Sequence, residues 1–504
     1  MTTATQDVIS HNEKNNAVLS KKTVVAFGSG AMGEAVYLAL FNGFITIYYN
    51  QVLGLSNTLI GVAIMLALIG DAITDPVVGI VSDRWRSRHG RRHPFLFAAP
   101  IPIAISLFFI FSPPDSFVLN SEGSTQWALF AWLVLWTIMS RAFITLYIVP
   151  HLALGGELSK DQHQRSRLFS ANSVFTYVSS AFFSFFVWSY FFAGEHVRES
   201  DGLSVPGHLD AASYGPLILF SACIVILSIW GCAAGTYKQV PTLSQVSGDL
   251  PRYSFRHVVE EVLSTFKNKN YTIVMFGFFF FMIASGIYDT LYVFMDTYFW
   301  ELAPEEIRWL RLVSAPAAMI GALSAPRLMR RFDRKPVMLS ALAGMVVFTQ
   351  LTVDLRLLGW MPENHSPKLL PILMANAAGF TLTLGIGSVA IFSMIGDIID
   401  ENELNTGLRQ EGLFYSARAF FAKASYSFGH LVAGIALDHF VRLPLQSAPG
   451  DLDVDVLVRL GIVAGPTMGI VALISLNIYS RYKLSRERHQ EIISSLKNES
   501  MSTV

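Results

Sequence analysis

The sequence is poor in charged residues. Of its 504 residues, 15% are charged, and Lys+Arg and Asp+Glu balance at 37 each. A soluble domain carries about 25% charged residues, so the composition excludes an ordinary soluble protein. The lack of net charge gives no reason to expect a nucleic-acid partner. Only two cysteines occur, Cys223 and Cys232, in one apolar stretch. They predict packed thiols rather than a disulfide or a metal site.

Signatures of catalysis are also missing. The sequence contains no H-E-x-x-H, no G-x-S-x-G and no histidine pair within its apolar runs. An enzyme working inside the membrane would need such a nucleophile–base pair or metal cluster, so we predict that the protein is not an enzyme. The polar N-terminus MTTATQDVISHNEKNNAVLSKK lacks the apolar core of a signal peptide, and we expect the first apolar run to be retained.

Long apolar runs are what the sequence has in abundance. Hydrophobic residues make up 52% of the chain, and 38 residues are Phe. A helix needs about 20 apolar residues to cross the hydrocarbon core. We predict such helices at residues 24–49, 59–81, 94–112, 126–150, 168–193, 214–235, 271–298, 307–328, 336–355, 369–396, 412–437 and 456–480. The runs are continuous rather than alternating, which is not the pattern of a transmembrane barrel.

The distribution of Lys and Arg predicts the orientation of these helices. Cations cluster after the second, fourth, sixth and eighth runs and after the twelfth, whereas NQVLGLSNT and SPPDSFVLNSEGSTQ on the other side contain none. Loops rich in Lys and Arg stay on the cytoplasmic side. We therefore expect a multi-pass protein of the cell inner membrane with both termini cytoplasmic.

Two six-helix halves follow from this layout. We predict a cytoplasmic N-terminal tail at 1–23, a bundle at 24–235, a cytoplasmic central loop at 236–270, a bundle at 271–480 and a cytoplasmic C-terminal tail at 481–504. Both halves carry a basic turn after their second helix, SDRWRSRHGRRHP in the first and RLMRRFDRKP in the second. This all-α layout resembles the major facilitator superfamily. The resemblance implies a substrate site between the two halves, near the midplane of the membrane.

The first basic turn resembles the loop signature of that superfamily, G-x-x-x-D-R-…-G-R-R/K, with a longer spacing between its two parts. The matching residues are Gly79, Asp83, Arg84, Gly90, Arg91 and Arg92. The resemblance implies that Asp83, Arg84, Arg91 and Arg92 help to latch a cytoplasmic gate. The alternative is that the arginines only fix the topology.

Two carboxylates lie in the second apolar run. Asp71 and Asp75 in GDAITDPVVGI are four residues apart and share one helix face. An ionisable group within a span costs about 2.5–3.5 kcal/mol and usually serves function. Two neighbouring carboxylates both stay ionised only with a cation between them; otherwise one takes a proton. The pair therefore predicts a Na⁺ or H⁺ coupling site, against the alternative that each acid pairs with a buried base.

Other polar groups within the spans are candidates for the same machinery. Arg141 is a candidate counter-ion for the acids or a partner of an anionic substrate, and Lys423 is a second candidate counter-ion. Thr145, one turn after Arg141, offers a hydroxyl oxygen of the kind that hard cations accept. Glu34 and Asp289 lie within the first and seventh runs, as candidates for substrate binding.

Three more acids and a histidine lie nearer the ends of the spans. Asp397 and Asp400, in MIGDIIDENE, predict either a gate ion pair with cytoplasmic arginines or a solvated helix end. His151 follows Pro150 and is expected to be a hydrogen-bonded core residue or a contact of the substrate or gate. Asp296 is nearer the outer end of its run, and we expect it at the interface.

Taken together, these segments resemble one family. GDAITDPVVGIVSDRWRSRHGRRHP, VPHLALGGELSKDQHQRSRLFS and GDIIDENELNTGLRQEGLFYSARAFFAKAS are similar to the glycoside–pentoside–hexuronide:cation symporters, typified by the bacterial melibiose carrier. The resemblance covers most of the chain. It implies that Asp71 and Asp75 bind the cation and that Thr145 and Lys423 lie near that site.

The sugar-binding residues of the melibiose carrier are not matched. Where that carrier has acids, a tryptophan and an arginine, an ungapped comparison places Ala35, Ile148, Leu152 and Ser173 here. Tyr37 and its apolar neighbours would line the corresponding pocket. The cation coupling therefore carries over by resemblance, whereas the sugar specificity does not.

The sequence predicts a secondary active transporter that couples a small organic solute to Na⁺ or H⁺. By resemblance the solute is glycoside-like. A more apolar anion, steroid-like or lysolipid-like, and a membrane sensor that does not transport are the alternatives. We expect membrane lipid and the substrate as partners, a monomer, and no cofactor beyond the coupling ion.

Overall fold

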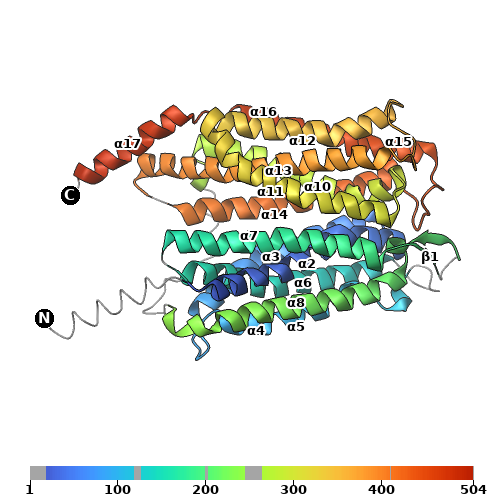
Figure 1. The fold of residues 1–504 in the computed structure, drawn as a ribbon, viewed down its shortest axis with the longest axis horizontal. Coiled ribbons are helices and arrows are strands. Elements are labelled where there is room, and N and C mark those ends of the chain that lie inside the picture. Colours follow the sequence, from blue (N-terminus) through green and yellow to red (C-terminus); the bar gives the residue numbers. More distant parts are fainter. Residues whose placement is uncertain are drawn as a thin grey trace. The chain divides into compact units, whose positions relative to one another are not determined.

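The computed structural model describes residues 19–118, 126–159, 161–198, 202–243, 264–408 and 410–502. Most of the predicted N-terminal tail, the middle of the central loop and the last two residues lie outside this part of the chain. The chain forms two compact units, Met1–Leu55 with Leu66–Pro251, and Ser56–Met65 with Arg252–Val504. Within each unit, long helices run side by side (Figure 1).

The first unit contains the six apolar runs predicted in the first half, apart from residues 59–65 of the second run. Its helices and short strands are α2 (Lys21–Ile47), η1 (Tyr48–Val52), α3 (Asn57–Arg84, from Leu66 onward), α4 (His93–Ala98), α5 (Pro100–Ile110), η2 (Asp115–Phe117), α6 (Gln126–Glu157), α7 (Gln162–Phe186), η3 (Val187–Phe191), β1 (Glu195–Val197), β2 (Ser204–Pro206), η4 (Gly207–Leu209), η5 (Ala211–Ser213), α8 (Tyr214–Thr236) and η6 (Tyr237–Thr242). The two strands pair antiparallel, with His196 opposite Val205.

The second unit contains the other six runs. Its helices are α10 (Lys269–Phe294), η7 (Met295–Phe299), α11 (Pro304–Phe332), α12 (Arg334–Leu357), α13 (Leu369–Thr406), α14 (Glu411–Ile435), η8 (Ala436–Val441), α15 (Val454–Ile462), η9 (Val463–Thr467), α16 (Met468–Ser480) and α17 (Arg486–Ser502). The last of these, α17, projects from its unit at the C-terminal end (Figure 1).

Local sequence signals set the helix ends. Ser20, Asp161 and Asn268 cap α2, α7 and α10, because each side chain accepts a hydrogen bond from the backbone N–H three residues later. Pro304 opens α11 at a position where its missing N–H costs nothing. Gly407 ends α13 in the left-handed conformation, with φ of 69°.

The helices are suited to a lipid environment. In the described part of the chain, eleven helices are long and apolar enough to cross a membrane. The remaining predicted span, at residues 412–437, corresponds to α14, which is 25 residues long and carries Arg418 and Lys423. The Arg418 guanidinium lies 4.3 Å from the centre of the Phe392 ring within the same unit. Exposed apolar side chains such as Leu227 and Leu323, 70% and 64% exposed, fit contact with hydrocarbon rather than water.

Among the described residues, four helices end in a π-helical turn, and a fifth π turn, η9, lies between α15 and α16. The first and fifth helices of each unit, α2, α7, α10 and α14, run directly into η1, η3, η7 and η8. π-helical turns are rare and concentrate at functional sites. Their recurrence at equivalent places in the two units supports the internal repeat that the basic turns suggested.

The second and fourth helices of each unit meet in different ways. In the second unit, α11 and α13 are in backbone contact: a Cβ on Gly385 would lie 3.0 Å from the backbone nitrogen of Ala322. In the first unit, a Cβ on Gly70 of α3 would meet only the Ile138 side chain of α6, at 3.5 Å. This looser spacing between α3 and α6 leaves room for polar side chains between them.

A compact segment follows α7 and contains a buried histidine. His208 in η4 is fully buried, with its ring 5.0 Å from that of Trp188, and its backbone oxygen accepts a hydrogen bond from the Tyr214 hydroxyl. Burial lowers the pKa of the His208 imidazole from about 6.5 to about 3. The folded protein therefore keeps this ring neutral at pH values where the unfolded chain protonates it.

We expect this histidine to make the protein less stable in mild acid. Because its pKa is lowered on folding, its contribution is fully present above pH 6.5 and is lost as the pH falls below that value. At pH 5 the loss should be about 2 kcal/mol. Thermal unfolding at pH 7.5 and pH 5 should show a smaller pH effect in His208→Gln than in the wild type. His163→Gln, at an exposed position, is the control, and equal pH effects in all three proteins would contradict this account.

Candidate functional site

The predicted carboxylate pair lies between α3 and α6 in the first unit. Asp71 is 1% exposed, and Asp75 follows it by one helical turn on α3. Arg141 and Thr145 have the same spacing on α6. The two matched pairs face each other, since Arg141 binds Asp71 and Thr145 binds Asp75.

Arg141 is the counter-ion of Asp71. Its Nε donates to both carboxylate oxygens, at 3.2 and 3.0 Å, and its Nη2 also bonds Asp71. The guanidinium lies 5.6 Å from the centre of the Phe41 ring, within the range of a cation–π contact. Of the two roles that the sequence left open for Arg141, the structure shows the ion pair.

Thr145 holds the second carboxylate. Its hydroxyl donates to Asp75 Oδ1 at 2.9 Å, and the residue is only 4% exposed. A hydroxyl that donates its proton to a carboxylate directs oxygen lone pairs away from it. Asp75 and Thr145 thus bring two oxygen ligands of the kind that a hard cation accepts close together.

Tyr37 and Ser140 support this cluster. The buried Ser140 hydroxyl donates to the Tyr37 hydroxyl at 2.9 Å, directly beside Arg141 in the chain. Glu34 lies one turn earlier than Tyr37 on α2. Within the described ranges, the Glu34 carboxyl forms no hydrogen bond or ion pair with another residue.

His151 is held by packing and hydrogen bonds inside the first unit. Its ring stacks on Phe27 with centroids 4.4 Å apart, and Nε2 lies 3.0 Å from Asn172 Oδ1. Its Nδ1 faces the Cys232 sulfur at 3.6 Å. Both ring nitrogens therefore have partners, which is the first of the two arrangements expected for this residue.

Lys423 and Asp289 belong to the second unit. Lys423 is half-buried on α14, and Asp289 lies on α10. The Tyr426 hydroxyl of α14 donates a hydrogen bond to Asp289. Asp289 is thus held in place by Tyr426, which lies one turn after Lys423 on α14.

The predicted gate residues form one ionic cluster in each unit. In the first unit, Arg92 bonds Asp83 and Glu157, and Arg91 pairs with Glu157 at 2.9 Å. Arg92 is 4% exposed, and Arg84, at the end of α3, is exposed. Glu157 ends α6 and was not predicted; its signal in the sequence is an acid at the end of an apolar run.

In the second unit, Asp397 and Asp400 meet a base from α12 and a histidine from α17. Arg334 Nε lies 2.7 Å from Asp397, and His489 Nε2 lies 3.0 Å from Asp400. These acids are therefore paired rather than solvated. The nearby Tyr482 hydroxyl has its pKa raised, chiefly by burial and also by Asp397, so it stays neutral.

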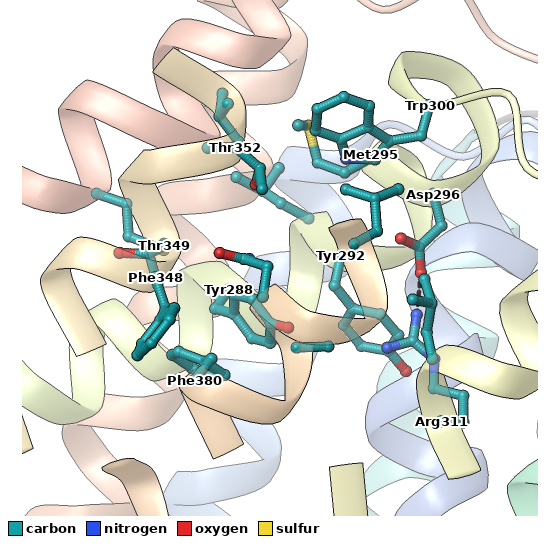
Figure 2. Close-up of a pocket in the computed structure, with 18 residues that line it drawn as sticks. Tyr288, Tyr292, Met295, Asp296, Trp300, Arg311, Phe348, Thr349, Thr352 and Phe380 are labelled. Carbon is teal, nitrogen blue, oxygen red and sulfur yellow. Dashed lines mark hydrogen bonds and ion pairs between the residues drawn. The ribbon is translucent and has the colours of Figure 1, made fainter. Parts of the chain in front are cut away.

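A further buried ion pair was missed by sequence reasoning. Asp296, expected at the interface, is 8% exposed and pairs with Arg311 of α11. The pair borders a pocket of the second unit (Figure 2). The π turn η7 and the short connection to α11 bring the two residues together, 15 positions apart in the chain. In the sequence, Asp296 by itself gave no sign that Arg311 is its partner.

Long apolar helices with buried ionic clusters are typical of a polytopic membrane protein. The model of the MFS/sugar transport protein family matches residues 26–486, and the chain belongs to this family. It is a secondary transporter with the twelve-helix major facilitator fold.

Individual relatives agree with this family. The uncharacterized symporter YnaJ of Bacillus subtilis is 24% identical over 496 residues, covering 97% of each chain. The putative glycoside/cation symporter YagG of Escherichia coli is 24% identical over 491 residues, covering 94% of each. The inward-open structure of the Escherichia coli xylose transporter XylE has a TM-score of 0.55 and 13% identity, covering 94% of this chain and 98% of that chain.

Proposed function

We propose that this protein is a symporter that couples a glycoside to a monovalent cation, Na⁺ or H⁺. The observation that carries the proposal is the cluster between α3 and α6, in which Arg141 pairs with Asp71 and the Thr145 hydroxyl donates a hydrogen bond to Asp75. Asp71, Asp75, Thr145 and Lys423 are the proposed cation-site residues.

The chemistry of the cluster supports a monovalent cation as the coupling ion. Its two carboxylates and one hydroxyl supply hard oxygen atoms of the kind that Na⁺ accepts, and a carboxylate can take a proton instead. Binding of either ion changes the charge between α3 and α6 by one unit.

Coupling follows from linkage. If the cation stabilises the substrate-binding state, substrate must raise the affinity for the cation by the same factor. Alternating access then requires the ionic clusters around Arg92 and Arg334 to form and break, and we propose that Asp83, Arg84, Arg91, Asp397 and Asp400 take part. Both clusters lie at the predicted cytoplasmic ends of their helices.

The names of relatives support a sugar-like substrate. One is called a putative glycoside/cation symporter, one a putative sulfoquinovose importer and one a glucuronide carrier protein homolog. Glu34, Tyr37, Arg141, His151 and Asp289 stay our candidates for substrate contact. We also propose an inner-membrane location, cytoplasmic termini, a monomeric state and the lack of a cofactor.

Uptake by vesicles containing the purified protein tests the proposal. Radiolabelled methyl glycosides are supplied with an inward Na⁺ gradient, a pH gradient or neither. We expect one gradient to raise the initial rate at least tenfold in the wild type. Asp75→Asn should remove that stimulation, because it removes one of the two carboxylates of the proposed cation site, while Asp115→Asn at an exposed site should behave as the wild type.

Two results would overturn the coupling proposal. One is uptake that no gradient stimulates. The other is stimulation that survives in Asp75→Asn, which would make the carboxylate structural. The carrier class would stand in either case, because equilibrative uptake of the glycoside is measured in the same vesicles without a gradient.

A further inference from the structure

A pocket within the second unit has the features of a ligand site and does not involve the carboxylate pair. It is lined by residues of α10, η7, α11, α12, α13, η9 and α16. Its volume is about 90 Å³, where one water needs about 10–15 Å³. The pocket therefore has room for a small ligand or for several waters.

The polar side of the pocket is formed by the ion pair of Asp296 and Arg311 (Figure 2). Arg311 also lies over the Tyr292 ring, 4.2 Å from its centre. In the part of the chain that the structure describes, no group accepts a hydrogen bond from the buried Arg311 Nε. The buried Asn376 Oδ1, in the same lining, likewise receives none from any described residue. Buried polar atoms are normally satisfied, so this donor and this acceptor point to a missing polar partner.

The opposite side is aromatic. Tyr288 packs against Phe380 with ring centroids 4.6 Å apart and an angle of 31°. It also stacks with Tyr292 at 6.1 Å. Phe348 lies close to Phe380, whereas Trp300 lies on the side of Asp296 (Figure 2). Apolar walls with a few convergent polar groups are typical of small-molecule sites. A pyranose matches this arrangement, because its C–H faces are apolar and its hydroxyls both donate and accept.

The charge of the pocket selects a neutral ligand. Asp296 already balances Arg311, so an anion would leave a buried negative charge without a partner. The Asp289 carboxylate, seven residues before Asp296 on the same helical segment, adds to this effect because it also interacts with Arg311. Glucuronate-like and sulfonate-bearing sugars are therefore disfavoured here.

We propose that this pocket binds the neutral pyranose ring of the transported glycoside, with Asn376 and the Asp296–Arg311 pair bonding its hydroxyls. The inference rests on the proposed transport of glycosides and places their recognition in the C-terminal unit. It accounts for a carrier that lacks the N-terminal sugar-binding side chains.

Calorimetric titration of the purified protein, without any gradient, tests this assignment. The probes are 4-nitrophenyl glucoside, galactoside and xyloside, with 4-nitrophenyl glucuronide as the anionic counterpart. We expect at least one neutral glycoside to bind the wild type ten or more times more tightly than the glucuronide. Asn376→Ala should weaken that binding at least tenfold. Thr381→Val, also on α13, should bind within twofold of the wild type, because its hydroxyl bonds only the backbone of its own helix.

Other outcomes overturn the assignment. Neutral binding unchanged in Asn376→Ala, equal binding of the glucuronide, or no binding of any neutral glycoside would each do so. Unfolding midpoints within 2 °C of the wild type show that a variant is folded, and Asn376→Asp provides a second variant if the alanine protein is not. Coupling is tested separately: gradient-driven uptake with unchanged binding in Asn376→Ala would refute the pocket and leave the symporter intact.

Discussion

Replacing Arg141 with methionine is expected to cost about 3–5 kcal/mol of unfolding free energy, the range for removing one partner of a buried ion pair. Asp71 is 1% exposed and would lose the guanidinium that bonds both of its oxygens. Methionine keeps the length and apolar volume of the side chain, so the loss reports charge rather than a cavity. Unfolding of the purified proteins in detergent, followed by circular dichroism, measures it.

The double variant Asp71→Asn with Arg141→Met is the matched control. It removes both charges, and we expect it to regain most of the stability that Arg141→Met loses. Replacing both partners of a buried ion pair usually changes the stability little. Destabilisation of the double variant equal to the sum of the two single variants would show that Asp71 and Arg141 do not interact. Wild-type stability of Arg141→Met would refute the ion pair itself.

The second large effect is expected at Gly385 of α13. A Cβ there would lie 3.0 Å from the backbone nitrogen of Ala322 on α11, and a still closer contact would form with the Ala318 oxygen. Backbone atoms of a packed helix cannot move aside as a flexible side chain can. We expect Gly385→Ala to lose about 3 kcal/mol, the upper part of the usual range for overpacked cores.

Gly387, two residues further along the same helix, provides the comparison. Its Cβ would lie 3.7 Å from Ala341 Cβ, an ordinary contact. Gly387→Ala should therefore be neutral or gain up to about 1 kcal/mol from helix propensity. Thermal unfolding of the two variants decides between backbone contact and a general intolerance of substitution in α13. Equal effects at both positions would contradict the close approach of α11 and α13.

Apolar run length predicted the spans well but not how far the helices continue beyond them. The run predicted at 369–396 belongs to a helix that continues to Thr406. The segment GDIIDENELNT is polar, so hydropathy ends at the apolar boundary, whereas the helix ends only where Gly407 adopts positive φ. The π turns could not be predicted, because they depend on packing at the helix ends.

The candidate site was predictable where the spacing on two helices matched. Asp71 and Asp75 on one helix, and Arg141 and Thr145 on another, share an i,i+4 interval, and the structure pairs them in that order. The Asp296–Arg311 pair had no such signal, because its partners meet through a turn whose geometry the sequence does not reveal. Contacts set by tertiary geometry, rather than by helical periodicity, are what sequence reasoning missed.

The different ways in which the second and fourth helices meet give the two units different mechanical properties. In the second unit, α11 and α13 are in backbone contact at Gly385, and the stiffness of this contact does not depend on ions or on ionic strength. In the first unit, α3 and α6 are held together by carboxylates, a guanidinium and a hydroxyl, whose attraction changes with every charge added or removed. One unit thus has a rigid seam between these helices, and the other has a seam whose strength depends on its charge.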